Sequence, residues 1–192
     1  MRFHKATYSA FALLVFSASL ATAQTSQPEV PYVPTTDEAV QVMLKLADVK
    51  KADVIYDLGC GDGRIIIAAA KNYGARGVGI DINPQRIQEA KENAKKAGVE
   101  NLVRFEENDL FKADIHDATV VTLFLLPTVN LRLRPKLLQE LKPGTRIVSN
   151  TFDMGDWKAD KEQTLNGDGP GSDDYGLSQK FFLWIVPRRD QK

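Results

Sequence analysis

The stretch "VIYDLGCGDGR", residues 54–64, places three glycines directly behind a short apolar run. The glycines at 59, 61 and 63 alternate with other residues. Glycine accepts backbone angles that other residues avoid and lets the main chain approach a ligand closely. The run after the turn, residues 64–74, has a helical composition and ends in glycine. A strand, a glycine turn and a helix in this order predict the first unit of an α/β sheet with a ligand above the turn.

The bulk properties of the chain are those of one globular domain. It has 192 residues, of which 43% are hydrophobic and 26% charged. The formal net charge is zero, so bulk charge predicts neither a nucleic-acid partner nor an anionic membrane. Cys60 is the single cysteine, which excludes an intramolecular disulfide.

Residues 1–23 have the layout of a secretory signal peptide. Arg2 and Lys5 precede an apolar run of 11 residues, and small residues come just before Gln24. A membrane-spanning helix needs roughly 20 apolar residues, so the run is short for one. We expect cleavage and export to the periplasm. The alternative is an uncleaved anchor that associates the domain with a membrane.

Strand-like and helix-like stretches alternate after this leader. Their order predicts right-handed crossovers and a mostly parallel sheet with helices on its faces. A turn-rich stretch at 166–176 predicts a closing antiparallel hairpin, and Pro135 predicts a break or a second start in its helix. The expected strands are 53–59, 76–81, 102–109, 118–126, 145–152 and 180–187, and the expected helices are 35–49, 64–74, 83–98 and 127–144.

Three aspartates, Asp57, Asp81 and Asp109, fall at carboxyl ends of expected strands and therefore on one rim of the sheet. The carboxylate of Asp81 can accept both hydroxyls of a ribose, and that of Asp109 can accept an exocyclic amine. Arg64 stands where a dinucleotide fingerprint has its third glycine, which disfavours a pyrophosphate. The pattern indicates an adenosine site. The alternatives are that Asp57 bonds its own glycine turn, Asp81 starts a helix and Asp109 forms a turn.

Three stretches, "VIYDLGCGDGR", "GVGIDI" and "FEENDLF", closely resemble the first three cofactor motifs of class I S-adenosylmethionine-dependent methyltransferases. The resemblance covers about residues 31–152. "PYVPT" (31–35) and "VVTLFLLP" (120–127) narrow it to the group with the lysine methyltransferases of ATP synthase c-subunit and adenine nucleotide translocase. It implies a Rossmann-like, doubly wound, mostly parallel seven-stranded sheet with a C-terminal antiparallel hairpin strand. The methyltransferase domain would be 32–188, after a flexible lead-in at 24–31.

The same resemblance implies S-adenosyl-L-methionine as the cofactor and gives roles to residues. Asp57, Gly59 and Gly61 would border its methionine part, Asp81 its ribose, and Asp109 with Leu110 its adenine. Tyr32 and Thr35 would cover it. The full set expected to bind the cofactor is Tyr32, Thr35, Asp57, Gly59, Cys60, Gly61, Gly63, Asp81, Ile82, Asn108, Asp109 and Leu110.

The substrate side departs from many amine methyltransferases. Phe124, Leu125, Leu126 and Pro127 replace an Asn/Asp-Pro-Pro-Tyr motif, so this loop offers backbone carbonyls and no polar side chain. Orienting the acceptor can supply much of the rate acceleration. The sequence identifies no residue for proton transfer. No metal and no nucleic-acid partner are expected.

The predicted function is methylation of a protein lysine. Small-molecule methylation, an exported adenosine-binding module without turnover and an NAD-linked oxidoreductase are the alternatives. Several residues are expected to have structural and not catalytic roles: Cys60, Trp157 and Trp184 in packing, and His116 in a solvated loop. Tyr32 could equally be a lid over the core.

Overall fold

The computed structural model describes residues 32–166 and 178–188. The predicted leader, the lead-in at 24–31 and nearly all of the predicted turn at 166–176 lie outside these residues. Within them, no helix combines the length and apolar character needed to cross a membrane.

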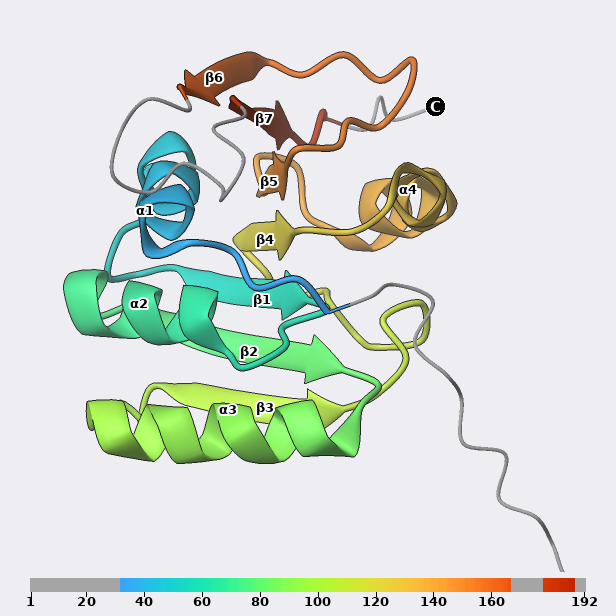
Figure 1. Ribbon diagram of the computed structural model, residues 1–192. Helices are drawn as coiled ribbons and strands as arrows, with labels where there is room; N and C mark the ends of the chain where they lie inside the picture. Colours follow the sequence, from blue (N-terminus) through green and yellow to red (C-terminus); the bar gives the residue numbers. More distant parts are fainter. Residues whose placement is uncertain (1–31, 167–177, 189–192) are drawn as a thin grey trace, which may run out of the picture.

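The described residues form one sheet of seven strands with the order β3-β2-β1-β4-β5-β7-β6, which Figure 1 shows from bottom to top. β1 to β5 are parallel, and β7 pairs antiparallel with both β5 and β6. This confirms the predicted fold class. The strands are β1 (Val54–Leu58), β2 (Arg76–Asp81), β3 (Val103–Glu107), β4 (Val120–Leu123), β5 (Arg146–Asn150), β6 (Lys161–Leu165) and β7 (Gln179–Ile185); the helices are α1 (Asp37–Leu46), α2 (Arg64–Tyr73), α3 (Pro84–Ala97) and α4 (Pro127–Glu140).

Local signals fix where the helices begin and end. Thr36 caps α1 by accepting a hydrogen bond from the Ala39 amide, and Asn83 caps α3 in the same way. Gly74 and Gly98 end α2 and α3 in the left-handed conformation, which glycine adopts without strain.

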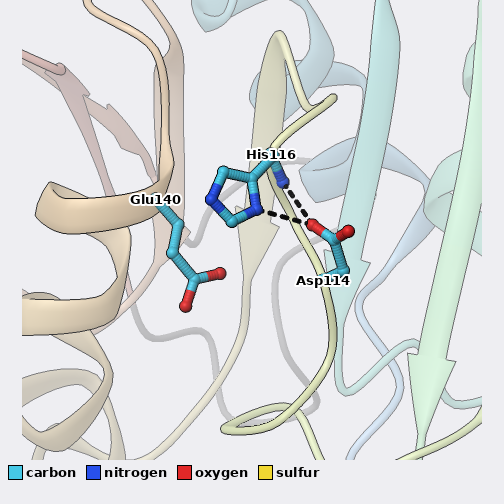
Figure 2. A group of neighbouring side chains, drawn as sticks. All are labelled: Asp114, His116 and Glu140. Atoms are coloured by element: carbon cyan, nitrogen blue, oxygen red, sulfur yellow. Dashed lines mark hydrogen bonds and ion pairs between the residues drawn. The ribbon is translucent and has the colours of Figure 1, made fainter.

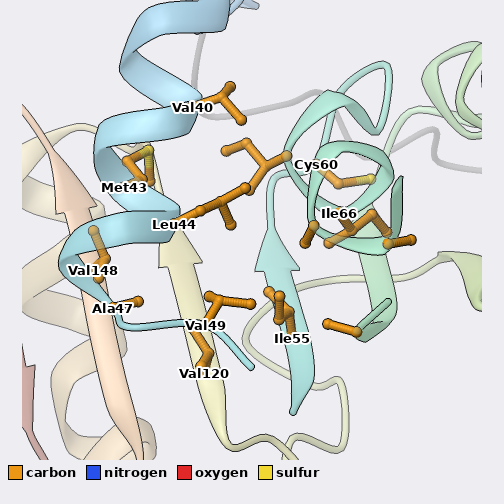
Figure 3. Packing of buried hydrophobic residues seen from close by; sticks show 14 of the residues in the cluster. Val40, Met43, Leu44, Ala47, Val49, Ile55, Cys60, Ile66, Val120 and Val148 are labelled. Carbon is orange, nitrogen blue, oxygen red and sulfur yellow. The ribbon is translucent and has the colours of Figure 1, made fainter. Parts of the chain in front are cut away.

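The two faces of the sheet are covered differently. Helices α1, α2 and α3 pack on one face, where Val40, Met43 and Leu44 of α1 meet the strands (Figure 3). The other face is covered by α4 and by the loops 109–118 and 152–160. Trp184, whose indole donates to the Trp157 carbonyl at 2.8 Å, is fully buried there, in the packing role predicted for it.

Two expectations about the elements were wrong, and one strand was missed. β4 ends at Leu123, so Phe124 to Leu126 lie beyond the strand. Pro135 lies inside a continuous α4, where it is exposed, so water can accommodate the carbonyl it leaves unbonded. The edge strand β6 was not located from sequence because "KEQTL" is polar and nearly all exposed.

Candidate active site

A cavity of about 240 Å³ lies at the carboxyl ends of β1, β2 and β4. Gly63, Leu126 and Pro127 do not line it, although the sequence placed them in the site. The predicted residues that it brings together are Tyr32, Thr35, Asp57, Gly59, Cys60, Gly61, Asp81, Ile82, Asn108, Asp109, Leu110, Phe124 and Leu125.

The glycine turn forms the floor of the cavity. Gly59 and Gly61 have positive φ angles of 85° and 52°. The amide of Gly59 donates to the Ile80 carbonyl at 2.8 Å, which ties the turn to the end of β2. A Cβ on Gly59 would lie 2.9 Å from the side chain of Leu125, so bare backbone is required here. Gly63 has a packing reason instead, because a Cβ there would lie 2.6 Å from Phe105.

Asp81 holds the turn and faces the cavity at once. One of its carboxylate oxygens accepts the Gly61 amide and the other the Asn83 amide, both at 2.9 Å. The second bond reaches the residue that caps α3, but the cap itself is Asn83, and Asp81 also holds the glycine turn, so Asp81 is not merely the acid at the start of a helix. Each carboxylate oxygen keeps a further lone pair for a ligand hydroxyl, so the predicted ribose role is compatible with this geometry.

Among residues 32–166 and 178–188, no cation neutralises the buried carboxylate of Asp57. Thr122 Oγ1 donates to Asp57 Oδ1 at 2.8 Å, whereas the glycine turn is held by Asp81, so the alternative that Asp57 bonds its own turn is wrong. Burial raises the pKa of Asp57 to about 7; the Thr122 hydrogen bond opposes this, and the carboxylates of Asp81 and Asp62 reinforce it. Such a site stabilises a ligand that brings positive charge.

The far end of the cavity is formed by the loop after β3. Asp109 Oδ1 accepts the Phe111 amide at 2.9 Å, and its other oxygen lies 3.7 Å from Lys112 Nζ. The turn-forming alternative for Asp109 is therefore confirmed, and its role toward adenine stays a prediction. Leu110 and Phe111 give this end apolar walls.

The opposite end is bounded by Phe124 and Leu125 of the loop after β4; the loop after β5 contacts this loop but does not line the cavity. The rings of Phe124 and Phe152 stack with centroids 6.4 Å apart. Thr151, just before Phe152, has a φ of 66°, which is a strained angle for a β-branched residue. The buried amide of Asn130 donates to the Phe152 carbonyl at 3.2 Å. Sequence reasoning missed Phe152 and Asn130, whose contacts come from distant parts of the chain.

The roof of the cavity is the segment of residues 32–36, here called the strap. Tyr32, Val33, Pro34 and Thr35 all line the cavity. Arg64 Nη1 donates to the Thr35 carbonyl at 2.7 Å and so connects the strap to the glycine turn. Further lining residues that the sequence did not assign are Val33, Pro34, Asp62, Arg64, Ile65, Ile80, Asn83, Arg86, Phe111 and Val129.

Cys60 lines the cavity but is only 5% exposed, and burial raises the pKa of its thiol. A Cβ on Gly79 would lie only 2.8 Å from the Cys60 sulfur. These contacts match the packing role predicted for it.

A second cluster, Asp114, His116 and Glu140, lies outside the cavity (Figure 2). His116 Nδ1 pairs with Asp114 at 2.7 Å, and both residues are exposed, as expected for a solvated loop. Both carboxylate oxygens of Glu140 accept Lys136 Nζ, at 2.8 and 2.7 Å. Because a lysine already neutralises Glu140, this cluster gives no argument for a metal.

The chain is similar to known proteins over most of its length. Residues 57–161 match the family model of the ANTKMT methyltransferase domain. The chain is 52% identical over 160 residues to a protein-lysine N-methyltransferase of Saccharolobus islandicus, covering 83% of this chain and 95% of the relative. It is 35% identical over 130 residues to the ATP synthase c-subunit lysine N-methyltransferase of Xenopus laevis, covering 68% of this chain and 57% of that protein.

Among solved structures, an RNA methyltransferase from Salinibacter ruber in complex with S-adenosyl-L-homocysteine is 50% identical, with a TM-score of 0.74. The match covers 83% of this chain and 97% of that one. S-adenosyl-L-homocysteine is what remains of S-adenosyl-L-methionine after methyl transfer, when the sulfonium has lost its charge. The bare glycine turn, the buried Asp57 and the carboxylate of Asp81 fit S-adenosyl-L-methionine, a cationic adenosine derivative.

Fold, cavity and relatives together define an S-adenosylmethionine-dependent methyltransferase. The chain belongs to the ANTKMT methyltransferase family.

Proposed function

We propose that the protein methylates the side-chain amine of lysine residues in other proteins. The observation that carries this proposal is the 52% identity to a relative named as a protein-lysine N-methyltransferase, over nearly the whole length of that relative.

The acceptor end of the cavity has a chemistry that suits lysine. Phe124 and Leu125 line it with aromatic and aliphatic surface, and Phe152 stacks on the Phe124 ring. A lysine side chain packs its methylene stem on such surface, and an aromatic face attracts its cationic head by about 0.5–2 kcal/mol.

The bound cofactor supplies a methyl group activated by its sulfonium. The residues of the chain then have to align the amine with that methyl group and exclude water, and such orientation can supply roughly 7–11 kcal/mol. Phe124 and Leu125 from the β4 loop and the strap above them border the space in which an acceptor would lie.

Transfer of radioactive methyl groups from S-adenosyl-L-methionine tests the acceptor class. The full chain is incubated with a cell lysate, and the products are divided and digested with protease or ribonuclease. We expect label that protease releases, and methyllysine in the hydrolysate. The Asp81→Ala variant serves as the inactive control.

RNA is the second candidate acceptor, because the solved relative at 50% identity is called an RNA methyltransferase. If ribonuclease removes the label and protease does not, the lysine proposal is wrong and RNA is the acceptor. Label confined to the low-mass fraction would indicate the small-molecule alternative.

We also propose export of the domain to the periplasm. The basic, apolar and small-residue order of residues 1–23 supports it. N-terminal sequencing of the protein from a fractionated cell tests it: a start at Gln24 in the periplasmic fraction is expected, and a start at Met1 in the membrane fraction would favour the anchor.

A further inference from the structure

Arg64, the first residue of α2, makes one cluster of contacts that joins the glycine turn to the strap. Its Nε and Nη2 donate to the two carboxylate oxygens of Asp62, at 2.9 and 2.7 Å. Its Nη1 donates to the Thr35 carbonyl at 2.7 Å. All three guanidinium nitrogens are therefore used, two on the turn and one on the strap.

The turn side of this cluster is rigidly held. The Asp62 carbonyl accepts Asn93 Nδ2 of α3 at 3.1 Å, and the Arg64 amide donates to the Asp62 carboxylate at 3.3 Å. Burial is the largest single influence and opposes the charge on Asp62, but the hydrogen bonds and charge of Arg64, with a hydrogen bond from Tyr32, together lower the pKa of that carboxyl below its usual range. The pair therefore stays charged, and its two parallel bonds fix the direction of the guanidinium.

The strap is held at both of its ends as well. Thr36, its last residue, caps α1. Tyr32, its first residue, has the guanidinium of Arg86 at 4.1 Å from its ring centre. The Tyr32 ring also lies so close to Gly61 that a Cβ there would be 2.5 Å from Tyr32 Cε2. The absence of a side chain at Gly61 thus lets the strap rest directly on the turn.

We propose that Arg64 is a positioning residue that latches the strap over the bound cofactor and thereby slows cofactor release. The strap forms the roof of the cavity and the turn forms its floor, so a ligand between them leaves when the roof moves. The Arg64 bond to Thr35 is the direct link from floor to roof backbone. Lysine can replace it only in part, because one ammonium has no planar fork to hold Asp62 and Thr35 in fixed directions.

Surface plasmon resonance with the immobilised full chain and S-adenosyl-L-homocysteine tests the latch. We expect Arg64→Met to raise the dissociation rate at least tenfold and to change the association rate less than threefold. Arg64→Lys is expected to fall between this variant and the wild type. This test does not depend on which acceptor the enzyme uses.

Arg146 offers a matched control at the opposite edge of the sheet. Its guanidinium pairs with Asp53 and donates to the carbonyls of Ala47 and Asp48, at 2.7 and 3.0 Å. We expect Arg146→Met to lower the melting temperature and to leave the dissociation rate unchanged. A rise in dissociation rate in Arg64→Met no larger than that in Arg146→Met would overturn the latch, because it would then reflect general loosening.

A double variant separates the latch from a local packing effect. If Arg64 and Tyr32 both act by keeping the strap closed, Tyr32→Ala accelerates release in the wild type and adds less than twofold in the Arg64→Met background. Multiplicative effects of the two substitutions on the dissociation rate would contradict the proposal.

Discussion

Two buried aspartates lie at opposite ends of β1. Each accepts a hydrogen bond from a threonine hydroxyl, but their other surroundings differ. Asp53 precedes β1 at the amino edge of the sheet, and Thr119 Oγ1 donates to it at 2.7 Å. Asp57 lies at the carboxyl edge, and Thr122 Oγ1 donates to it at 2.8 Å. The two side chains belong to residues that are 6% and 3% exposed, so burial does not distinguish them.

Their remaining partners do distinguish them. Asp53 forms an ion pair with Arg146 and accepts the Lys50 amide at 2.7 Å. Asp57 faces the cavity, and the charges that act on it are two further carboxylates. The amino edge is satisfied within the chain and serves stability, whereas the carboxyl edge keeps an uncompensated carboxylate for a ligand.

The largest effect is expected at the carboxyl edge. Asp81→Ala removes two acceptors for the ribose, and each bond to a charged group is worth about 1.5–3 kcal/mol, so we expect about hundredfold weaker binding of S-adenosyl-L-homocysteine by calorimetry. Asp114→Ala, which removes an exposed carboxylate away from the cavity, is the control. A loss below threefold in Asp81→Ala would remove Asp81 from the ribose role.

The amino edge should respond in stability and not in binding. Arg146→Met leaves the Asp53 carboxylate buried without its cation, and breaking such a pair costs about 3 kcal/mol of unfolding free energy, measurable by urea denaturation. We expect the affinity for S-adenosyl-L-homocysteine to stay the same. Weaker binding with unchanged stability would contradict the assignment of the amino edge to stability and the carboxyl edge to ligand binding.

Cofactor binding should depend on pH through Asp57. Since its pKa is raised to about 7, the carboxylate is mostly protonated at pH 6 and mostly ionised at pH 8. If the ionised form binds the cationic cofactor, affinity for S-adenosyl-L-methionine rises about tenfold between these values. Calorimetry of Asp57→Asn should show a much flatter profile, and an equal slope in both proteins would exclude Asp57 as its source.

The same shift has a consequence for the free protein. The folded state holds this proton more tightly than the unfolded chain, so the contribution of Asp57 to stability falls as pH rises from about 4 to 7. The unfolding free energy of Asp57→Asn minus that of the wild type should therefore be larger at pH 8 than at pH 5. Urea denaturation at both pH values measures it. A constant difference would contradict the raised pKa.

The smallest effects separate the two threonines. Thr119→Val should lower the unfolding free energy by about 1 kcal/mol and leave the pH profile of binding unchanged. Thr122→Val removes the bond that favours ionised Asp57, so the pH profile should move upward and affinity at pH 7 should fall a few-fold. Equal pH profiles in the two variants would show that Thr122 does not tune Asp57.

The sequence was most informative where the cause of a structure is local. Thr36, Asn83, Gly74 and Gly98 mark helix ends through bonds to residues within a few positions, and the expected helices 64–74 and 83–98 agree with α2 and α3 to within one residue at each end. β6 was missed because an edge strand exposed to water needs no apolar pattern. The continuity of α4 through Pro135 depends on exposure, which the sequence does not show.

The residues of the site also divide into those that a local pattern reveals and those that depend on distant contacts. The glycine turn and the three aspartates were found because strand ends bring them to one rim. The contact of Arg64 with Thr35 spans 29 positions, that of Arg146 with Asp53 spans 93, and that of Asn130 with Phe152 spans 22. No local pattern encodes these pairs, and the difference between Asp53 and Asp57 depends on one of them, the pair of Arg146 with Asp53.

The most direct measurement is a ¹³C NMR titration of the Asp57 carboxyl group, in the free protein and with S-adenosyl-L-methionine bound. We expect a midpoint near the value of about 7 in the free protein and a clear move to lower pH in the complex, where the cofactor brings positive charge. A midpoint in the ordinary aspartate range without ligand, or one that the cofactor leaves in place, would contradict the role of Asp57 as the carboxylate kept for a cationic ligand.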